Sequence, residues 1–335
     1  LNVGRFKLGA MCVGGARLSL ENAIGYAKQR KAFNKVIADF GLVREKLANM
    51  AVGIYTGEAL VYRTVGMMDA ALSEIDKSAA DAAKETRKAI EEYAVECSII
   101  KVWGSEMVGY VVDETVQIYG GYGFVEEYPA ERAYRDARIN RIFEGTNEIN
   151  RLIITGFLLK RAMSGQLPLM PAIKKLMDEV LSGPSISEDL EGPLAEERKL
   201  VMSAKKLGLF VSGAATQKYM QAIQDQQEVM GAIADIVIET YAMESAVLRA
   251  QKIAERNGEN AAALPIAMTR VYLSQAMEKI EAAAKKVIAT VADGDMLRTQ
   301  LAILRRLAKH EPFNTIELRQ QIAQKIIERG KYTLA

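Results

Sequence analysis

The sequence has little of the residue types on which many enzymes and small extracellular domains depend. It holds one histidine, His310, and two cysteines, Cys12 and Cys97, among 335 residues. A single histidine near the C-terminus excludes a Ser-His pair or a histidine metal cluster elsewhere in the chain. Two cysteines within apolar stretches exclude a disulfide framework and a cysteine metal site, so we expect no bound metal. Proton chemistry is therefore left to carboxylates, lysines or tyrosines.

An excess of charge of one sign and long apolar runs are also absent. Lys and Arg number 44 and Asp and Glu number 42, which gives a formal net charge of +2. Because this charge creates no net field for phosphate polymers, nucleic acid is not expected as a partner. The run from Leu152 to Leu159 is far shorter than the roughly 20 residues of a spanning helix, so the sequence predicts no transmembrane segment.

Proline is scarce, and its positions divide the chain. All seven prolines lie at or after Pro129, which allows long uninterrupted helices before that position. Apolar residues at spacings of three and four predict helices over about 6–29, 40–72 and 85–119, with a fourth over 147–163. These four helices predict a bundle.

A second helical module is predicted after a linker. Four of the seven prolines and three glycines fall between residues 164 and 193, which predicts a linker at 164–194. Further amphipathic helices are expected over about 195–224, 228–256, 264–292 and 297–307, and no strand pattern of convincing length is present. The sequence therefore predicts an all-α fold, with a four-helix bundle at 1–163 and a helical extension domain at 195–335.

Three glycines follow an apolar helix within four residues. Gly120, Gly121 and Gly123 require either close approach of another group to the backbone or positive φ angles. A glycine turn that caps the helix explains them equally well. Without a preceding strand they do not form a nucleotide-binding fingerprint, so the residues alone leave both interpretations open.

Glu144 stands just before the fourth predicted helix. Thr146 or Asn147 can cap that helix, and Glu148 is favoured in its first turn by the helix dipole. Glu144 has no comparable structural role. The two residues before it are apolar, and partial desolvation of the carboxylate suits a base that works near neutral pH.

Four ordered blocks of the sequence resemble the acyl-CoA dehydrogenase family. Residues 117–136 fit its C-terminal signature, and residues 143–147, Phe-Glu-Gly-Thr-Asn, look like its catalytic loop. Residues 29–33 are similar to its Arg-x-x-Phe-Gly flavin motif, with Asn34 in place of the glycine. Residues 1–6 resemble the substrate-binding turn of the very-long-chain branch. In addition to these four blocks, residues 40–47 look like the same branch. The resemblance covers residues 1–163 in motif detail and the remainder in architecture only.

The resemblance implies an FAD-dependent enzyme of fatty acid β-oxidation. Such an enzyme oxidises a fatty acyl-CoA, here a long-chain one, to the trans-2-enoyl-CoA. Glu144 is implied as the base that removes the α-proton. In some branches the base lies instead at the position of Gly4, and a glycine there leaves Glu144 as the candidate.

The other site residues implied by the resemblance form two groups. Contacts with FAD are implied for Arg30, Phe33, Gln117, Gly120, Gly121, Thr146, Asn147 and Glu148. Contacts with the substrate are implied for Asn2, Arg5, Phe143 and Gly145, the first two toward its CoA part. In the family, the arginine and the glycine turn act on the flavin of the neighbouring subunit.

The resemblance also implies partners. We expect electron-transfer flavoprotein as the electron acceptor and a homodimer, because the apolar face of the extension would cover the bundle surface on which other members build tetramers. We expect a bacterial cytoplasm, or a mitochondrial matrix if the source is eukaryotic. The start at Leu1 lacks a methionine, and family members carry a helical and a β domain before this region, so we expect a fragment that is inactive alone.

Two other functions fit the same resemblance. The family includes a non-enzymatic assembly factor of a respiratory complex, and the extension would then be a docking surface. Acyl-CoA oxidase is the second alternative, which differs in the access of oxygen to the flavin.

Overall fold

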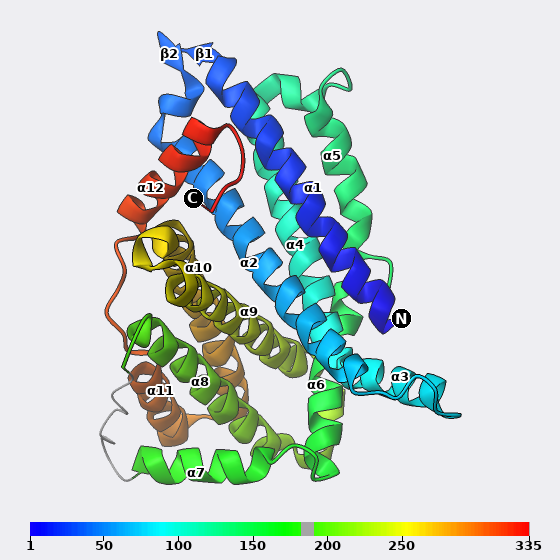
Figure 1. Ribbon diagram of the computed structural model, residues 1–335. Coiled ribbons are helices and arrows are strands. Elements are labelled where there is room, and N and C mark those ends of the chain that lie inside the picture. Colours follow the sequence, from blue (N-terminus) through cyan, green and yellow to red (C-terminus); the bar gives the residue numbers. More distant parts are fainter. Residues whose placement is uncertain (182–190, 335) are drawn as a thin grey trace. The chain divides into compact units, whose positions relative to one another are not determined.

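A computed structural model describes residues 1–181 and 191–334 (Figure 1). Over these residues the chain is almost entirely helical. The strands in the described part are β1 (Lys31–Ala32) and β2 (Lys35–Val36), which pair antiparallel in a two-residue ladder. The predicted all-α fold is therefore confirmed.

Twelve α-helices follow one another within the described residues. The first six are α1 (Asn2–Gln29), α2 (Gly41–Ser73), α3 (Ala82–Glu92), α4 (Ala94–Tyr119), α5 (Pro129–Arg138) and α6 (Asn147–Met163). The others are α7 (Leu169–Leu181), α8 (Ala195–Tyr219), α9 (Gln227–Asn257), α10 (Glu259–Val291), α11 (Gly294–Ala308) and α12 (Thr315–Arg329). Short 3-10 helices are η1 (Ile37–Asp39), η2 (Gly120–Phe124), η3 (Ile139–Arg141) and η4 (Met220–Asp225).

Some elements differ from those expected. The helix predicted over 85–119 is two helices, because the backbone at Tyr93 leaves the helical region with φ −94° and ψ 21°. Helix α5 was missed because its buried residues are two alanines. The linker predicted at 164–194 contains α7, since Pro171 lies in the first turn of that helix, where its missing N–H removes no intrahelical bond. Residues 182–190 of that linker lie outside the described residues.

Contacts divide the described chain into two compact units. Unit 1 comprises Leu1–Asn147, Ser245–Tyr272 and Phe313–Ala335, and unit 2 comprises Glu148–Glu244 and Leu273–Pro312. Segments from the second half of the chain, α12 among them, therefore belong to unit 1. The division of the sequence into a bundle at 1–163 and an extension domain at 195–335 stays a prediction.

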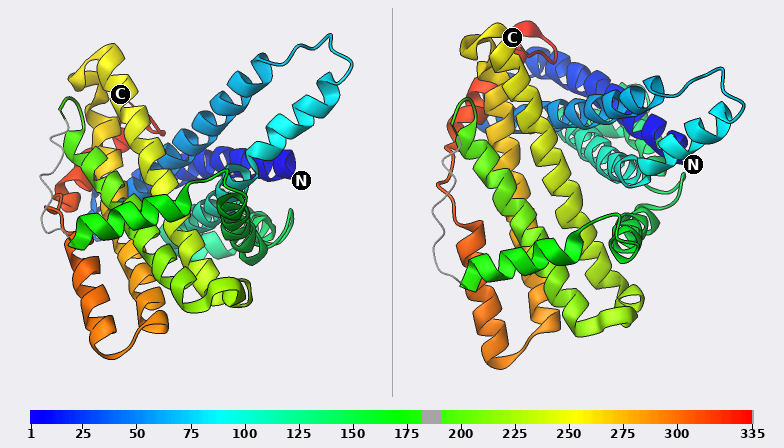
Figure 2. Two further views of the ribbon diagram at one scale, coloured as in Figure 1. Left: turned by 90° about the horizontal axis from the view of Figure 1, so that it is seen from below. Right: turned by 60° about the horizontal axis from the view of Figure 1, so that its bottom comes forward.

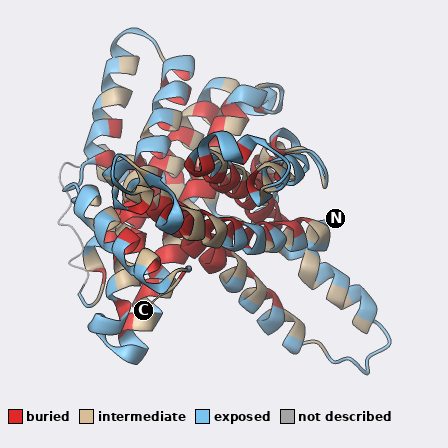
Figure 3. Cartoon of the chain, turned by 90° about the horizontal axis from the view of Figure 1, so that it is seen from above, coloured by how far each residue is buried: buried red, intermediate tan, exposed pale blue. Residues whose placement is uncertain are grey.

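The core of unit 1 forms where α1, α2, α4 and α12 pack together (Figures 1 and 2). Helices α1 and α4 approach closely because Gly9 and Gly104 face each other. A Cβ atom added to Gly104 would lie 3.1 Å from the Cα of Gly9. Figure 3 shows the buried residues gathered along the facing sides of these helices, whereas the α2–α3 connection is largely exposed. This close contact holds α4 against α1, and α4 contacts the segment that follows η3.

Glu58 of α2 joins distant segments of unit 1. This buried carboxylate forms ion pairs with Arg17 at 3.2 Å and Arg249 at 2.8 Å, and it accepts a hydrogen bond from the hydroxyl of Tyr332 at 3.0 Å. A buried charge is tolerated when its partners replace the lost water. The cluster therefore connects α1, α9 and the segment after α12 to α2.

Candidate active site

Glu144 lies between η3 and α6 in a turn with left-handed backbone. The φ angle is 58° at Glu144 and 82° at Gly145. For a residue with a Cβ this conformation costs about 1–2 kcal/mol, so other contacts must stabilise it. One such contact comes from Arg5 in the first turns of α1, whose Nε donates a hydrogen bond to the carbonyl oxygen of Glu144 at 3.2 Å.

The carboxylate of Glu144 lies against α1 at Gly4. A Cβ atom added to Gly4 would come within 2.7, 2.8 and 2.9 Å of the three carboxyl atoms of Glu144. The Oε2 atom of this carboxylate is buried from solvent. Glycine at position 4 therefore provides the space that Glu144 occupies, and the structure brings together the two positions that the sequence analysis had linked as alternative sites for a base.

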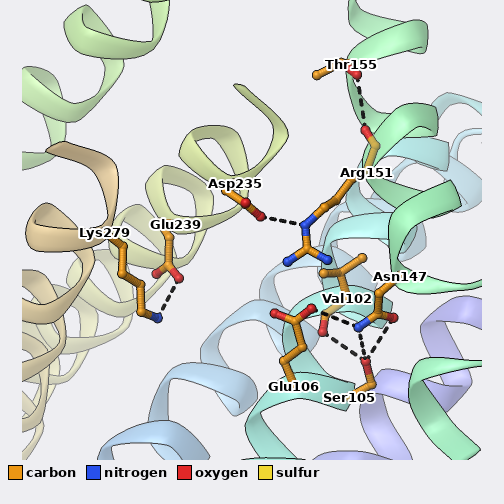
Figure 4. A network of polar contacts seen from close by, with 9 residues as sticks. All are labelled: Val102, Ser105, Glu106, Asn147, Arg151, Thr155, Asp235, Glu239 and Lys279. Atoms are coloured by element: carbon orange, nitrogen blue, oxygen red, sulfur yellow. Dashed lines mark hydrogen bonds and ion pairs between the residues drawn. The ribbon is translucent and has the colours of Figure 1, made fainter. Parts of the chain in front are cut away.

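The end of the turn is anchored to α4. Asn147 is buried, and its side-chain amide nitrogen donates to Ser105 Oγ and to Glu106 Oε1, both at 3.0 Å (Figure 4). Its side-chain oxygen accepts a hydrogen bond from Lys101 Nζ at 2.7 Å. Lys101 Nζ also donates to the carbonyl oxygen of Gly145 at 2.7 Å. The Asn147 amide thus has its polar contacts inside unit 1, and Lys101, which the sequence analysis missed, lies fully buried behind the turn.

Three residues expected to contact FAD line one open cleft. Arg30, Gly120 and Gly121 border a cavity of about 810 Å³ at the C-terminal ends of α1 and α4. The Arg30 side chain is exposed, and its guanidinium lies 5.6 Å from the centroid of the Tyr122 ring. Gly120 has φ 60° and ψ −139°, a conformation open to glycine almost alone. The cleft therefore combines an accessible cation with backbone that no Cβ covers.

Two stacked tyrosines form a fixed wall of this cleft. The rings of Tyr26 and Tyr119 lie 4.1 Å apart, and the Tyr26 hydroxyl donates to the Tyr119 carbonyl oxygen at 3.2 Å. Burial raises the pKa of both hydroxyls above the usual value for tyrosine. They are therefore neutral donors across the physiological pH range.

Gln117 and Phe33 lie outside the lining of that cleft. Gln117 is exposed, and its carbonyl oxygen accepts the N–H of Gly120 at the end of α4. Phe33 is 89% exposed and forms, with Asn34, the two-residue turn between β1 and β2. Their φ angles are 50° and 65°, as in a type I′ turn, in which Asn is well tolerated. Asn34 thus replaces the family's glycine without excluding the turn.

The remaining expected site residues lie in the first turns of α1 or next to Glu144 in the sequence. Asn2 is half-buried and its side-chain oxygen lies 3.5 Å from Arg5 Nη1, while Arg5 itself is only 6% exposed. Phe143 is 42% exposed, Thr146 is half-buried, and Glu148 is exposed in the first turn of α6. Arg5 therefore has an internal contact with the Glu144 carbonyl. The substrate and FAD contacts expected of the residues in this paragraph stay predictions.

The described residues contain neither a membrane-spanning helix nor a metal cluster. Within residues 1–181 and 191–334, no helix is long and apolar enough to cross a lipid bilayer. The same part of the chain contains no group of three or more His, Cys, Asp or Glu side chains placed to hold a metal ion.

Comparison with known proteins identifies the family. Two family models, both described as acyl-CoA dehydrogenase, C-terminal domain, match residues 1–159 and 203–306. A probable acyl-CoA dehydrogenase of Bacillus subtilis is 44% identical over 334 residues, which are 100% of this chain and 56% of that protein. The mitochondrial very long-chain specific acyl-CoA dehydrogenase of Rattus norvegicus is 32% identical over 270 residues, 75% of this chain and 38% of that protein.

A solved structure agrees over nearly the whole chain. The crystal structure of an acyl-CoA dehydrogenase from Bacillus anthracis, complexed with FAD, matches with a TM-score of 0.96 at 48% identity and covers 99% of this chain and 56% of that one. The chain thus spans about half the length of the Bacillus proteins that it matches. The motif blocks, the family models and this structural match agree, and the chain belongs to the acyl-CoA dehydrogenase family, whose C-terminal domains it matches.

Proposed function

We propose that this chain forms the helical part of an FAD-dependent enzyme that oxidises fatty acyl-CoA to trans-2-enoyl-CoA, with Glu144 as the base. One observation carries the proposal: the Glu144 carboxylate lies over Gly4 with Oε2 buried, in a left-handed turn that Arg5 contacts. A carboxylate carried on such a turn, with one oxygen shielded from water, is directed toward one place beside α1. A base must be positioned in this way to remove a weakly acidic proton.

The reaction requires two contributions from the chain. The α-proton of a thioester is a weak acid, so the substrate carbonyl must be polarised while a base lies within about 3 Å of the proton. Glu144 supplies its carboxylate as the base and its backbone N–H as a donor to the carbonyl. The bond from Arg5 fixes the turn and so keeps the carboxylate and the N–H of Glu144 at a constant position relative to each other. Holding reacting groups in place lowers the entropic part of the activation barrier.

The residues of the Arg30 cleft fit a cofactor that bears phosphate groups. A guanidinium is suited to a diphosphate, and the uncovered backbone of Gly120 and Gly121 permits close approach. We propose that this cleft holds part of FAD, with Gln117 and the exposed Phe33 nearby and with Thr146, Asn147 and Glu148 near the flavin. When bound, FAD supplies the acceptor for the β-hydrogen as hydride.

The substrate class and partners are part of the same proposal. We propose a long-chain acyl-CoA whose CoA part meets Asn2 and Arg5, with Phe143 and Gly145 near the acyl group. Electron-transfer flavoprotein would reoxidise the enzyme in β-oxidation, and the similar proteins from Bacillus support a bacterial cytoplasm as the location. Packing of α12 against α2 within unit 1 supports the expected homodimer, because it covers bundle surface that a tetramer would need. A tetrameric mass by light scattering would contradict the dimer.

The two alternatives predict different behaviour. An assembly factor needs no base, and the position of Glu144 over Gly4 favours the enzyme. An oxidase would be reoxidised by oxygen at a rate comparable with turnover. Bleaching of the flavin by an acyl-CoA under nitrogen, followed by slow recovery in air and fast recovery with electron-transfer flavoprotein, distinguishes the dehydrogenase from both.

Replacement of the base tests the proposal directly. We expect Glu144→Gln in the full-length enzyme to bind FAD normally and to reduce the rate of acyl-CoA-dependent flavin reduction by about 10²- to 10⁴-fold, because shape is kept and the proton acceptor is lost. Glu228→Gln, an exposed position in the first turn of α9, serves as the control and should leave the rate unchanged. Reduction of the Glu144→Gln flavin at more than about a hundredth of the normal rate would exclude Glu144 as the base.

A further inference from the structure

One face of α4 supports the whole segment that carries Glu144. Lys101, Ser105 and Gly109 lie four residues apart and therefore share a face of the helix. A Cβ atom on Gly109 would collide with the guanidinium of Arg141, so Arg141 lies directly over this glycine just before the turn. On the other side of Glu144, Lys101 contacts Gly145, and both Lys101 and Ser105 contact Asn147, the first residue of α6. The turn is thus fixed to α4 on both sides.

Lys101 is a fully buried charge that donates hydrogen bonds to two groups of this segment. Its side chain is 0% exposed, and its ammonium donates to the Gly145 carbonyl and to the Asn147 side chain at 2.7 Å each. Desolvation of an ammonium is costly, and an apolar side chain of similar length would fill the same space without that cost. Packing alone therefore does not explain a lysine here. Hydrogen bonds from a charged donor to a backbone carbonyl do explain it, because they fix the orientation of a peptide.

Two cations bind consecutive carbonyl groups of the turn. Arg5 Nε contacts the carbonyl of Glu144, and Lys101 Nζ contacts the carbonyl of Gly145. Because a trans peptide is planar, fixing each carbonyl also fixes the N–H of the next residue in the opposite direction. The left-handed φ angles of Glu144 and Gly145 are therefore held by two contacts that approach from α1 and from α4.

We infer that Lys101 is a positioning residue for the base Glu144, an inference that rests on the proposed function. It acts through the Gly145 carbonyl and Asn147, and touches neither substrate nor cofactor. Loss of the ammonium lets the peptide between Gly145 and Thr146 rotate, which moves the Glu144 carboxylate from its place over Gly4. A displacement of about 1 Å near reacting groups can cost about 10²-fold in rate, so we expect a larger effect on proton removal than on substrate binding.

The experiment replaces Lys101 by methionine, which keeps length and removes the donors. In the full-length enzyme, we expect Lys101→Met to lower kcat for flavin reduction by about 10- to 100-fold, with the KM for acyl-CoA within about threefold of normal. The isotope effect of substrate deuterated at the α-carbon should rise, because a misplaced base makes proton removal a larger part of the barrier. Lys46→Met removes another lysine that pairs between α2 and α4, with Glu114, and should change none of these values.

A second measurement does not depend on turnover or on FAD. Hydrogen–deuterium exchange of the peptide covering residues 141–150, measured on this chain, should be at least about tenfold faster in Lys101→Met than in the unmodified chain, because the exchange rate of an amide follows its local opening. The peptide around Lys46 serves as the internal reference. If Lys101→Met does not fold, Ser105→Ala removes the hydroxyl bound to Asn147 and should change kcat and exchange in the same direction by a smaller factor.

The outcomes separate this inference from the proposed function. An inactive Glu144→Gln enzyme together with a normal kcat and normal exchange in Lys101→Met, or in Ser105→Ala where Lys101→Met does not fold, would overturn the role of Lys101 alone. An active Glu144→Gln enzyme would overturn the proposed function, whatever Lys101→Met does. A fall in kcat without a change in the isotope effect would show that Lys101 serves folding only, and would also overturn the inference.

Discussion

Two turns of unit 1 place residues other than glycine in left-handed backbone, and they are stabilised in different ways. Phe33 and Asn34 connect two short paired strands, and residues within a few positions supply the hydrogen bonds of the turn. Glu144 has no such ladder. Its turn is held by Arg5 and Lys101, which lie 139 residues before Glu144 and 44 residues before Gly145 in the chain. The first conformation follows from local sequence, whereas the second depends on the packing of α1 against α4.

If packed helices hold the Glu144 turn, the helices behind it should be closed to solvent. The reactivity of the two buried cysteines, Cys97 in α4 and Cys12 in α1, tests this expectation. Cys97 lies one turn before Lys101 on α4, and burial raises its pKa to about 12, with Glu96 adding to the shift and Arg5 opposing it. Burial also raises the pKa of Cys12 to about 12. Because only the thiolate reacts, we expect both thiols of the folded chain to react with a disulfide reagent at pH 8 about a thousandfold more slowly than ordinary thiols.

The sign of the accompanying pH effect follows from the same values. A thiol whose folded pKa lies above its unfolded value of 9.0 stabilises the folded state at lower pH, and this contribution is lost as the pH rises from about 9 toward 12. The melting temperature should therefore fall over that range. Chains unfolded in denaturant provide the control, and complete labelling of the folded chain within minutes at pH 8 would show that this part of unit 1 opens readily.

The substitution Gly4→Ala should separate the effect of Gly4 on catalysis from its effect on the stability of α1. In Gly4→Ala the new Cβ would occupy the place of the Glu144 carboxylate, which can move because it is the end of a flexible side chain. The helix itself gains about 0.5–1 kcal/mol from replacement of glycine by alanine. We expect unchanged or higher thermal stability together with a fall in kcat of about 10²-fold in the full-length enzyme.

Another glycine of the same helix is the control for that substitution. A Cβ atom on Gly14 meets nothing within 4 Å, so Gly14→Ala should raise the melting temperature and leave kcat unchanged. Equal losses of activity in both variants would mean that α1 tolerates no alanine and that Gly4 gives no specific space to Glu144.

Substitutions in the Phe33–Asn34 turn should have the smallest effect. We expect Asn34→Ala to destabilise the chain by about 1 kcal/mol, because alanine tolerates the left-handed region less well than asparagine, and Asn34→Gly to be close to neutral. Chemical denaturation of this chain measures both. A loss of several kcal/mol in Asn34→Ala would indicate that remote contacts hold this turn as well, and the contrast between the two turns would disappear.

The same contrast explains what could be predicted from the sequence. Helix periodicity predicted the long helices, and α6 begins and ends at the expected residues, because an apolar stripe is a local property. The resemblance gave Glu144, the role of Gly4 and three residues that line the cleft, Arg30, Gly120 and Gly121, but not the stacked tyrosines of its wall. Lys101 was missed, although a lone lysine between Ile100 and Val102 in an apolar helix is a visible signal. Its role needs the position of Gly145 above α4, which no local pattern contains.

The Glu58 cluster has a consequence for how the protein is made. Glu58 needs Tyr332, 274 residues later in the chain, and Arg249 to complete its set of partners. On a ribosome, α1, α2 and α4 emerge long before these two residues do. Until then, a carboxylate intended for the interior has only Arg17. Contacts of such long sequence separation form slowly, and partly assembled helical surfaces attract other chains. Unit 1 is therefore completed only after residue 332 has been synthesised, and chain termination before that residue should leave a bundle that requires chaperones to remain dispersed.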